Sequence, residues 1–122
     1  MNQRIKKLWI KALRSGKYKQ GQGGLRPSKD TFCCLGVLCD VQRREGYGQW
    51  RKEDGAGEFM FTGNGKTFEG SPATGILPLG TCEWAGLPDE GDPKLGRRVT
   101  AANLNDEGKN FDYIADKIEK YL

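Results

Sequence analysis

Residues 32–40 read FCCLGVLCD, and this stretch decides the fold. The seven positions after the phenylalanine are all apolar or glycine, so a helix formed here has no polar face to turn toward solvent. The pattern predicts a helix over residues 33–45 at the centre of the fold, ended by Gly46. Gly36 costs such a helix about 1 kcal/mol relative to alanine, so we expect another segment to pack closely against its backbone.

The chain before this helix predicts a second helix and a glycine-rich segment. The second helix spans residues 2–15, because its apolar residues recur along one stripe and Gly16 follows as a stop. The stripe comprises Ile5, Leu8, Trp9, Ala12 and Leu13, whereas Lys6, Lys7, Lys11 and Arg14 face the other way. Residues 17–30 are too rich in glycine for a helix, and we expect an irregular hairpin there. A short strand at residues 31–33 then leads into the central helix.

Residues 47–77 have the pattern of β-structure, because aromatic residues occur in short segments separated by glycine-containing turns. The dipeptide Asn64-Gly65 lies between residues 58–62 and 66–68, and such a dipeptide is typical of a hairpin turn. We expect a small antiparallel sheet of two to four strands. Its aromatic residues are Trp50, Phe59, Phe61 and Phe68.

Residues 78–122 predict three further helices. They cover residues 78–85 before Gly86, residues 99–107 before Gly108, and a last helix capped by Asn110. A chain of 122 residues suits one core. The predicted fold is therefore a small single α+β domain with about four to five helices and a small antiparallel sheet or hairpins.

The last two predicted helices have a superficial likeness to a helix-turn-helix motif. In that motif the second helix enters the major groove of DNA and needs a basic surface. Here that helix carries Asp112, Asp116 and Glu119, whose charges oppose those of phosphates. We expect no sequence-specific DNA reading by the C-terminal helices.

Charge is distributed unevenly along the chain. Residues 1–30 carry nine lysines and arginines against one acid, whereas the whole chain has a net charge of only +4. This asymmetry suggests a basic face for an acidic partner or phosphates, or a solvated face that keeps a small domain soluble. No apolar run is long enough for a membrane span, and the N-terminus lacks the apolar stretch of a signal peptide, so we expect a cytoplasmic protein with no membrane partner. Dimerisation would add buried area to a small core, so a homodimer is possible.

The four cysteines allow three interpretations. Cys33, Cys34, Cys39 and Cys82 could bind zinc, but no C-x-x-C pair and no histidine is present. Cys33 or Cys34 could be a nucleophile activated at a helix N-terminus, although the chain has no imidazole to act as its base. The third interpretation is that all four are small buried residues. We favour the third, and assign no catalytic residue, no metal and no cofactor.

A binding site for an anion is the other candidate. Flexible glycines and the polar side chains beside them could hold phosphates, while an aromatic ring stacks on a base. The residues proposed for this role are Lys17, Lys19, Gln20 and Arg26, with Trp50 or Trp84 as the stacking ring. A plain solvent-exposed loop is the alternative interpretation, since no P-loop or dinucleotide motif is present.

Four segments together resemble a family of small, uncharacterised proteins encoded in bacteriophage and prophage genomes. They are residues 13–21, 32–40, 83–87 and 104–109, which read LRSGKYKQG, FCCLGVLCD, EWAGL and LNDEGK. Residues 47–77 look like the variable insert of that family. The resemblance implies a phage accessory protein acting in the bacterial cytoplasm, and it carries over no catalytic residues.

Three classes of function follow from this sequence. The first is stoichiometric binding as a host-interaction or anti-defence protein, which inhibits a protein complex of bacterial immunity or sequesters a signalling nucleotide. The second is a cysteine-dependent enzyme that uses Cys33 or Cys34. The third is a small virion or assembly component.

Overall fold

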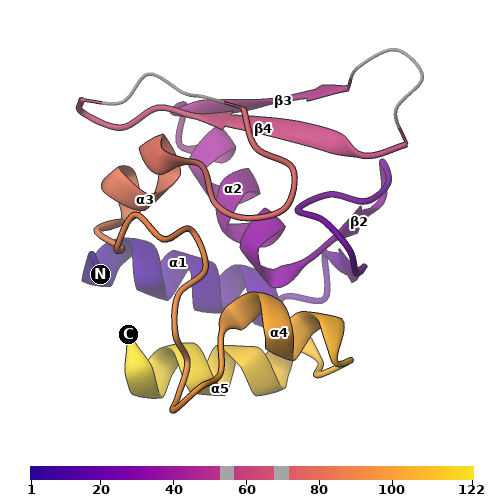
Figure 1. Ribbon diagram of the computed structural model, residues 1–122, viewed down its shortest axis with the longest axis vertical. Helices are drawn as coiled ribbons and strands as arrows, with labels where there is room; N and C mark the ends of the chain where they lie inside the picture. The colour runs from indigo at the N-terminus through magenta and orange to yellow at the C-terminus, as the bar shows by residue number, and fades with distance from the viewer. Residues whose placement is uncertain (53–56, 68–71) are drawn as a thin grey trace.

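The described part of the computed structural model, residues 1–52, 57–67 and 72–122, contains five helices and two sheets of two strands each. The elements in chain order are α1 (Gln3–Arg14), β1 (Lys19–Gln20), β2 (Thr31–Phe32), α2 (Cys34–Arg44), β3 (Gly48–Lys52), β4 (Phe59–Gly63), α3 (Leu79–Ala85), α4 (Ala101–Asp106) and α5 (Phe111–Tyr121). The β3–β4 sheet lies across one end of α2, and α4 and α5 form the opposite end of the molecule (Figure 1). This is the small α+β domain that the sequence predicts.

The central position of α2 is confirmed by its burial. Cys34, Leu35, Val37, Leu38 and Cys39 are each 0% exposed. The helix begins after Cys33, whose thiol accepts a hydrogen bond from the backbone N–H of Gly36, while the N–H of Cys34 donates to Oδ1 of Asn105 at 3.0 Å. These two bonds satisfy N–H groups that a helix start leaves without intrahelical partners.

Gly36 is present because the backbone of Leu25 lies directly against it. A Cβ placed on Gly36 would stand 1.8 Å from the carbonyl oxygen of Leu25, far inside contact distance. That same oxygen accepts a hydrogen bond from the N–H of Cys33 at 3.0 Å, and the Leu25 side chain is 0% exposed. The expected close approach to the central helix is therefore confirmed, and the approaching segment is the glycine-rich one.

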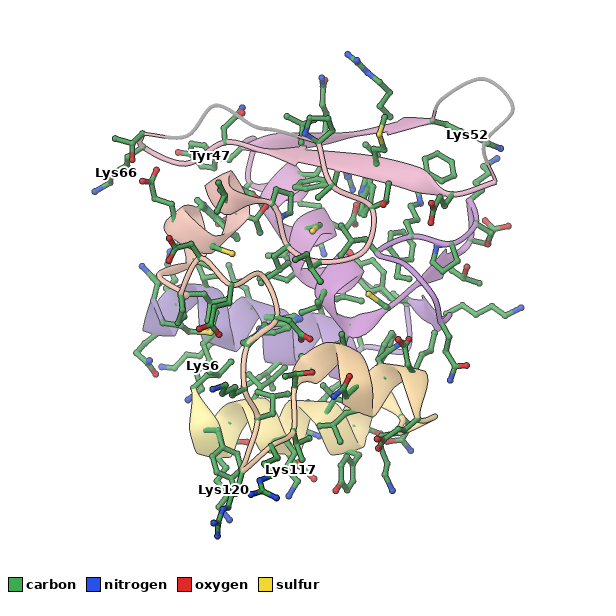
Figure 2. The ribbon with its side chains drawn as sticks, viewed as in Figure 1. Lys6, Tyr47, Lys52, Lys66, Lys117 and Lys120 are labelled. Atoms are coloured by element: carbon green, nitrogen blue, oxygen red, sulfur yellow. The ribbon has the colours of Figure 1, made fainter. Side chains whose placement is uncertain are left out.

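Helix α1 packs across α2 and α5 through its predicted apolar stripe. Trp9 is fully buried, and its indole N–H donates to the carbonyl of Cys34 at 2.9 Å. On the other flank, Arg14 pairs with Asp116 at 2.5 Å. Lys6, labelled between α1 and α5 in Figure 2, donates to the carbonyl of Glu119 at 3.0 Å. The helix ends where the sequence predicts, since Gly16 has a φ of +74°.

The other predicted helix boundaries are also confirmed. Asn110 caps α5, with Oδ1 accepting from the N–H of Tyr113 at 2.9 Å. The glycines expected to end α2, α3 and α4 adopt positive φ; they are Gly46, Gly86 and Gly108. Among the described residues, no helix is both long and apolar enough to cross a membrane.

The predicted hairpin over residues 17–30 is wrong in its strand direction. β1 pairs with β2 in parallel, with Lys19 opposite Thr31 and Gln20 opposite Phe32. The chain between them makes a full loop, because Leu25 is buried against α2 and the side chain of Gln22 donates to the carbonyl of Asn105 at 3.1 Å. These distant anchors carry the chain round so that it returns in the same direction.

The sheet within residues 47–77 is antiparallel, as predicted, but its partner strands differ. β4 pairs with β3, with Trp50 opposite Phe61. Among the described residues, the partner of β4 beyond the predicted Asn64-Gly65 turn is Ala73, which forms a single antiparallel bridge with Phe61, and not residues 66–67. Residues 64–67 are held instead against α3, where Glu83 accepts hydrogen bonds from the backbone and the hydroxyl of Thr67. Phe68, the end of the predicted second arm, and the Asp54-Gly55 turn lie outside the described residues.

Replacing Gly36 by alanine tests the contact with Leu25. In an exposed helix this substitution stabilises, but here the added methyl group overlaps a backbone carbonyl, and we expect a loss of about 3 kcal/mol or more of unfolding free energy. Urea unfolding followed by circular dichroism measures it. Gly75→Ala is the control, because nothing lies within 4 Å of its added Cβ. Equal stability of Gly36→Ala and the control would contradict the packing described here.

Candidate anion-binding surface

Asp40, at the end of the cysteine-rich stretch, organises a polar cluster at the edge of the core. Asp40 is 7% exposed, and both of its carboxylate oxygens accept hydrogen bonds. Oδ1 accepts from Nε of Arg43 at 2.7 Å and from the indole of Trp50 at 3.0 Å. Oδ2 accepts from the hydroxyl of Tyr18 at 2.6 Å and from Nη2 of Arg43 at 3.2 Å. A buried acid with this many donors fixes the positions of all three partners.

The pKa values of the cluster follow from these contacts. Burial by itself raises the pKa of Asp40, but the hydrogen bonds from Arg43, Tyr18 and Trp50 outweigh it and hold the pKa below the ordinary 3.8. Burial, together with the hydrogen bond to Asp40, raises the pKa of Tyr18 to about 12. At neutral pH the cluster therefore contains an ionised Asp40 and a neutral Tyr18.

Aromatic rings connect this cluster to the core. Tyr18, Phe32, Trp50 and Phe61 follow one another edge to face, with centroid distances of 5.1, 5.9 and 4.8 Å. Phe61 is fully buried, whereas Tyr18 and Trp50 are half-buried. Two rings held rigidly at the surface offer contact area to a partner with little further loss of side-chain freedom.

Arg26 lies against the same rings. Its guanidinium carbon is 4.8 Å from the centroid of Phe32, 5.3 Å from that of Trp50 and 4.3 Å from that of Phe59. Nε and Nη2 both donate to the carbonyl of Lys29, and burial lowers the pKa of the group. The structure thus brings together Arg26 and Trp50, two residues of the sequence-predicted site.

A groove of about 280 Å³ lies between α1 and α2 beside this cluster. Its lining residues are Leu8, Lys11, Ala12, Ser15, Lys17, Val41, Arg44 and Glu45. The one acid of the lining, Glu45, is already paired with Arg4 at 2.6 Å. Arg44 is close enough to Tyr18 to act on its pKa, which it lowers in part, and neither Lys11 nor Lys17 has an ion pair within the described structure. The groove is therefore positively charged.

The groove and the cluster are neighbours on the surface, because Lys17 and Arg44 line the groove, Tyr18 follows Lys17 in the chain, and Arg44 is close enough to Tyr18 to influence its pKa. We call this surface the basic aromatic face. It comprises Lys11, Lys17, Tyr18, Arg26, Arg43, Arg44 and Trp50. Its one buried acid, Asp40, is balanced by Arg43, so the charge presented to a partner is positive.

The other sequence-predicted binding residues lie elsewhere. Gln20 has a structural position: Nε2 donates to Oδ1 of Asn105 at 2.9 Å and to the carbonyl of Lys109 at 2.7 Å. Lys19 is exposed on β1. Trp84 lines a different groove, of about 450 Å³, together with Tyr47. The set of six predicted residues is thus divided over three places.

Sequence reasoning missed Tyr18, Asp40, Arg43 and Arg44 as parts of this surface. One signal was present: Asp40 is the first charged residue after a run of seven apolar or glycine positions, in a helix predicted to be central. An acid at such a place needs donors, and Arg43 lies three residues further on, on the same side of the helix. The presence of Tyr18 on this surface depends on the path of the loop over residues 17–30, and no local sequence pattern predicts that path.

The cysteines are buried, as the third interpretation of them predicts. Cys33 is 5% exposed and Cys34 is 0% exposed. Burial raises the pKa of the Cys33 thiol to about 11 and that of Cys34 well above its ordinary value. The proximity to a helix N-terminus that would lower these pKa values is outweighed by burial. Among the described residues, no three histidine, cysteine or acidic side chains are grouped to hold a metal ion.

The fold and the surface together define a small α+β domain with buried thiols and a basic aromatic face. The chain belongs to a family described as Domain of unknown function (DUF8296), whose model matches residues 1–122. No curated protein and no solved structure matches the chain.

Replacing Asp40 by asparagine tests the polar cluster. Removing the charge leaves Arg43 without its partner, and we expect a loss of about 2 to 4 kcal/mol of unfolding free energy at pH 7. The folded-state pKa of Asp40 lies below its ordinary 3.8, so the stabilisation is fully present above about pH 4 and is lost as the pH falls further. Urea unfolding should therefore show the difference from wild type shrinking at pH 3. Asp89→Asn, at an exposed acid, should leave stability unchanged at both pH values, and an equal loss for Asp40→Asn at both would refute this account.

Alkylation of the native protein tests the burial of the thiols. We expect iodoacetamide to leave Cys33 and Cys34 unmodified between pH 7 and 9, and to label all four cysteines in denaturant, because a buried neutral thiol is both inaccessible and unreactive. Mass spectrometry of the peptides identifies each modified position. Rapid labelling of either residue in the folded protein would restore the case for a cysteine nucleophile.

Proposed function

We propose that this protein is a phage- or prophage-encoded accessory protein that binds an acidic component of the host bacterium in a fixed stoichiometry. Its role is host interaction or anti-defence: occupancy of the partner, a protein complex of bacterial immunity, blocks that partner's own contacts. The site of action is the bacterial cytoplasm, and the surface is the basic aromatic face.

The observation that carries this proposal is the set of unpaired cations beside rigid rings. Lys11 and Lys17 have no ion pair within the described structure, and they line one groove with Arg44. A single exposed ion pair contributes only about 0 to 1 kcal/mol, so charge alone gives a fast but weak encounter. Tyr18 and Trp50 supply the aromatic anchors on which tight interfaces depend.

The shape of the surface favours a large partner over a small one. The groove of about 280 Å³ falls just below the ordinary range of ligand pockets, roughly 300 to 1,000 Å³. The cations continue beyond it to Arg43 and Arg26, along a surface wider than a small ligand covers. An acidic protein surface can contact all of them at once.

A signalling nucleotide is the second candidate, because Arg26 and Trp50 are neighbours. Lys52 also lies near, with its amine 5.6 Å from the ring of Phe59, against which Arg26 packs. Phosphates could then meet Arg26 and Lys52 while a base contacts Trp50. Against this candidate, two of the three guanidinium nitrogens of Arg26 already donate to Lys29.

The test is a charge reversal on the basic aromatic face. We expect wild-type protein purified from a bacterial host to carry its partner in a fixed molar ratio by native mass spectrometry, and Lys17→Glu combined with Arg44→Glu to lose it, because like charges then oppose each other. Inhibition of the partner should saturate at that ratio. A protein that acts as a catalyst would instead inhibit at far lower ratios.

Lys66→Glu combined with Lys52→Glu is the matched control, because it makes the same change of charge on the sheet side of the molecule (Figure 2). This control variant should still bind an acidic protein partner. Loss of a bound nucleotide in the control, through Lys52, would favour the second candidate. Equal retention of a partner in both double variants would refute a role for the basic aromatic face.

A further inference from the structure

Helix α5 separates its charges onto two flanks. Successive residues of a helix turn by about 100°, which places Asp112, Asp116 and Glu119 together on one flank. The same rotation places Tyr113, Lys117, Lys120 and Tyr121 together on the adjoining solvent-facing side. The opposing charges expected from the sequence are thus on different sides of the helix.

The acidic flank is occupied by α1. Arg14 lies 2.5 Å from Asp116, 3.7 Å from Asp112 and 3.9 Å from Glu119. The hydrogen bond to Asp116 also raises the pKa of Arg14. The three acid side chains stay largely exposed, at 71%, 71% and 69%, but they lie on the flank of α5 that faces Arg14 of α1, beside the lysine and tyrosine side and not on it.

The solvent-facing side presents an alternating ladder of lysine and tyrosine. Tyr113, Lys117 and Tyr121 follow at intervals of four residues, so they lie one above another along α5, and Lys109 precedes the helix next to Tyr113. Tyr113 is 39% exposed and Tyr121 is 45% exposed, so both rings are accessible to a partner. The amines of Lys109 and Lys117 lie 5.2 and 5.5 Å from the ring of Tyr113.

Lys120 and a neighbouring turn extend the positive charge around Tyr121. The amine of Lys120 is 5.2 Å from the ring of Tyr121, and Lys117 and Lys120 project from the outer side of α5 (Figure 2). The backbone of Gly96 is adjacent to the same ring, since a Cβ on Gly96 would lie 3.8 Å from it. The next residue, Arg97, is exposed on a turn closed by a 2.8 Å hydrogen bond between Leu95 and Val99.

We propose that this ladder binds single-stranded nucleic acid without sequence preference. Bases stack on Tyr113 and Tyr121, and phosphates contact the cations between and beside the rings, namely Lys109, Lys117, Lys120 and Arg97. Exposed rings interleaved with cations are the combination by which proteins hold single strands, because every base has a face that can stack. A duplex cannot use the rings, because its bases are already stacked on one another.

The dimensions of the ladder suit a strand of a few nucleotides. Eight residues of helix separate Tyr113 from Tyr121, a rise of about 12 Å. Stacked bases of one strand rise by about 3.4 Å each, so a strand of about four nucleotides reaches both rings. This surface is separate from the basic aromatic face, and the proposal does not depend on that face.

Fluorescence anisotropy of labelled oligonucleotides tests the proposal with the full chain. The probes are twelve-nucleotide oligo-dT and oligo-U strands, with a twelve-base-pair duplex as the third probe. We expect both single strands to bind at low salt and the duplex to bind more weakly. Tyr113→Ala combined with Tyr121→Ala should weaken single-strand binding at least tenfold, since each stacked ring contributes about 1 to 3 kcal/mol, or five- to 150-fold.

Tyr47→Ala is the matched control for the loss of an exposed ring. Tyr47 is 52% exposed and lies at the opposite end of the molecule from Lys117 and Lys120 (Figure 2), so this variant should bind like wild type. Circular dichroism confirms that the variants fold. Wild-type affinity in the double tyrosine variant would overturn the proposal, as would the absence of single-strand binding at 50 mM salt.

The salt dependence tests the lysines separately. Lys117→Gln combined with Lys120→Gln should reduce the slope of log affinity against log salt by about 1.4, because two phosphate contacts are lost. Lys52→Gln combined with Lys66→Gln removes the same charge at the other end and should leave the slope unchanged. A last comparison separates the ladder from the basic aromatic face. If Lys17→Glu combined with Arg44→Glu abolishes oligonucleotide binding while the double tyrosine variant still binds, the strand binds the basic aromatic face. That result would refute binding by the ladder.

Discussion

The contact between the carbonyl of Leu25 and the backbone of Gly36 is the constraint on which the rest of the structure depends. It brings a glycine-rich loop, which has almost no apolar residues of its own, against the most deeply buried helix of the domain. The Leu25 carbonyl is also hydrogen-bonded at this place, because it accepts from the N–H of Cys33 at the start of α2. The N–H of Leu25 donates to the carbonyl of Thr74 at 2.6 Å, so the same residue also ties down the chain beyond β4. One residue thereby fixes a loop, a helix start and the border of a sheet.

The position of Arg26 follows from this anchor. With Leu25 fixed in the core, the next side chain emerges beside β4, and the N–H of Phe59 donates to the carbonyl of Arg26 at 3.0 Å. The guanidinium then rests on three rings. Asn105 fixes the other end of the loop: it is fully buried, and its amide accepts from Cys34 and Gln20 and donates to the carbonyl of Gly21 at 2.8 Å. A loop with flexible composition is rigid here because two buried residues hold its backbone.

This dependence explains what the sequence could and could not predict. The helices were predictable within a few residues, because apolar periodicity, the cap at Asn110 and the glycine stops are local signals. The strand pairings were not, since the parallel β1–β2 pair and the β3–β4 register depend on contacts between distant residues. The candidate site divides in the same way. The sequence analysis placed Arg26 and Trp50 in one site, and the structure brings them together. Gln20 and Trp84 lie elsewhere, and Tyr18 was missed. The position of the Tyr18 side chain depends on the path of a loop, for which the local sequence has no signal.

Tertiary structure also decides which charged side chains remain available at the surface. The sequence gathers nine cations in its first 30 residues, but the fold uses several of them internally. Arg4 pairs with Glu45, Arg14 pairs with the acidic flank of α5, and Lys6 donates to a carbonyl at the end of the same helix. These contacts have two consequences. They leave Lys11 and Lys17 of the α1–α2 groove among the N-terminal cations without an ion pair in the described structure, and they set Arg14 against the acids of α5, on a flank separate from its lysines. The cations that can meet a negatively charged partner are therefore selected by how α1 packs against both α2 and α5, and a count of charges along the chain identifies neither surface.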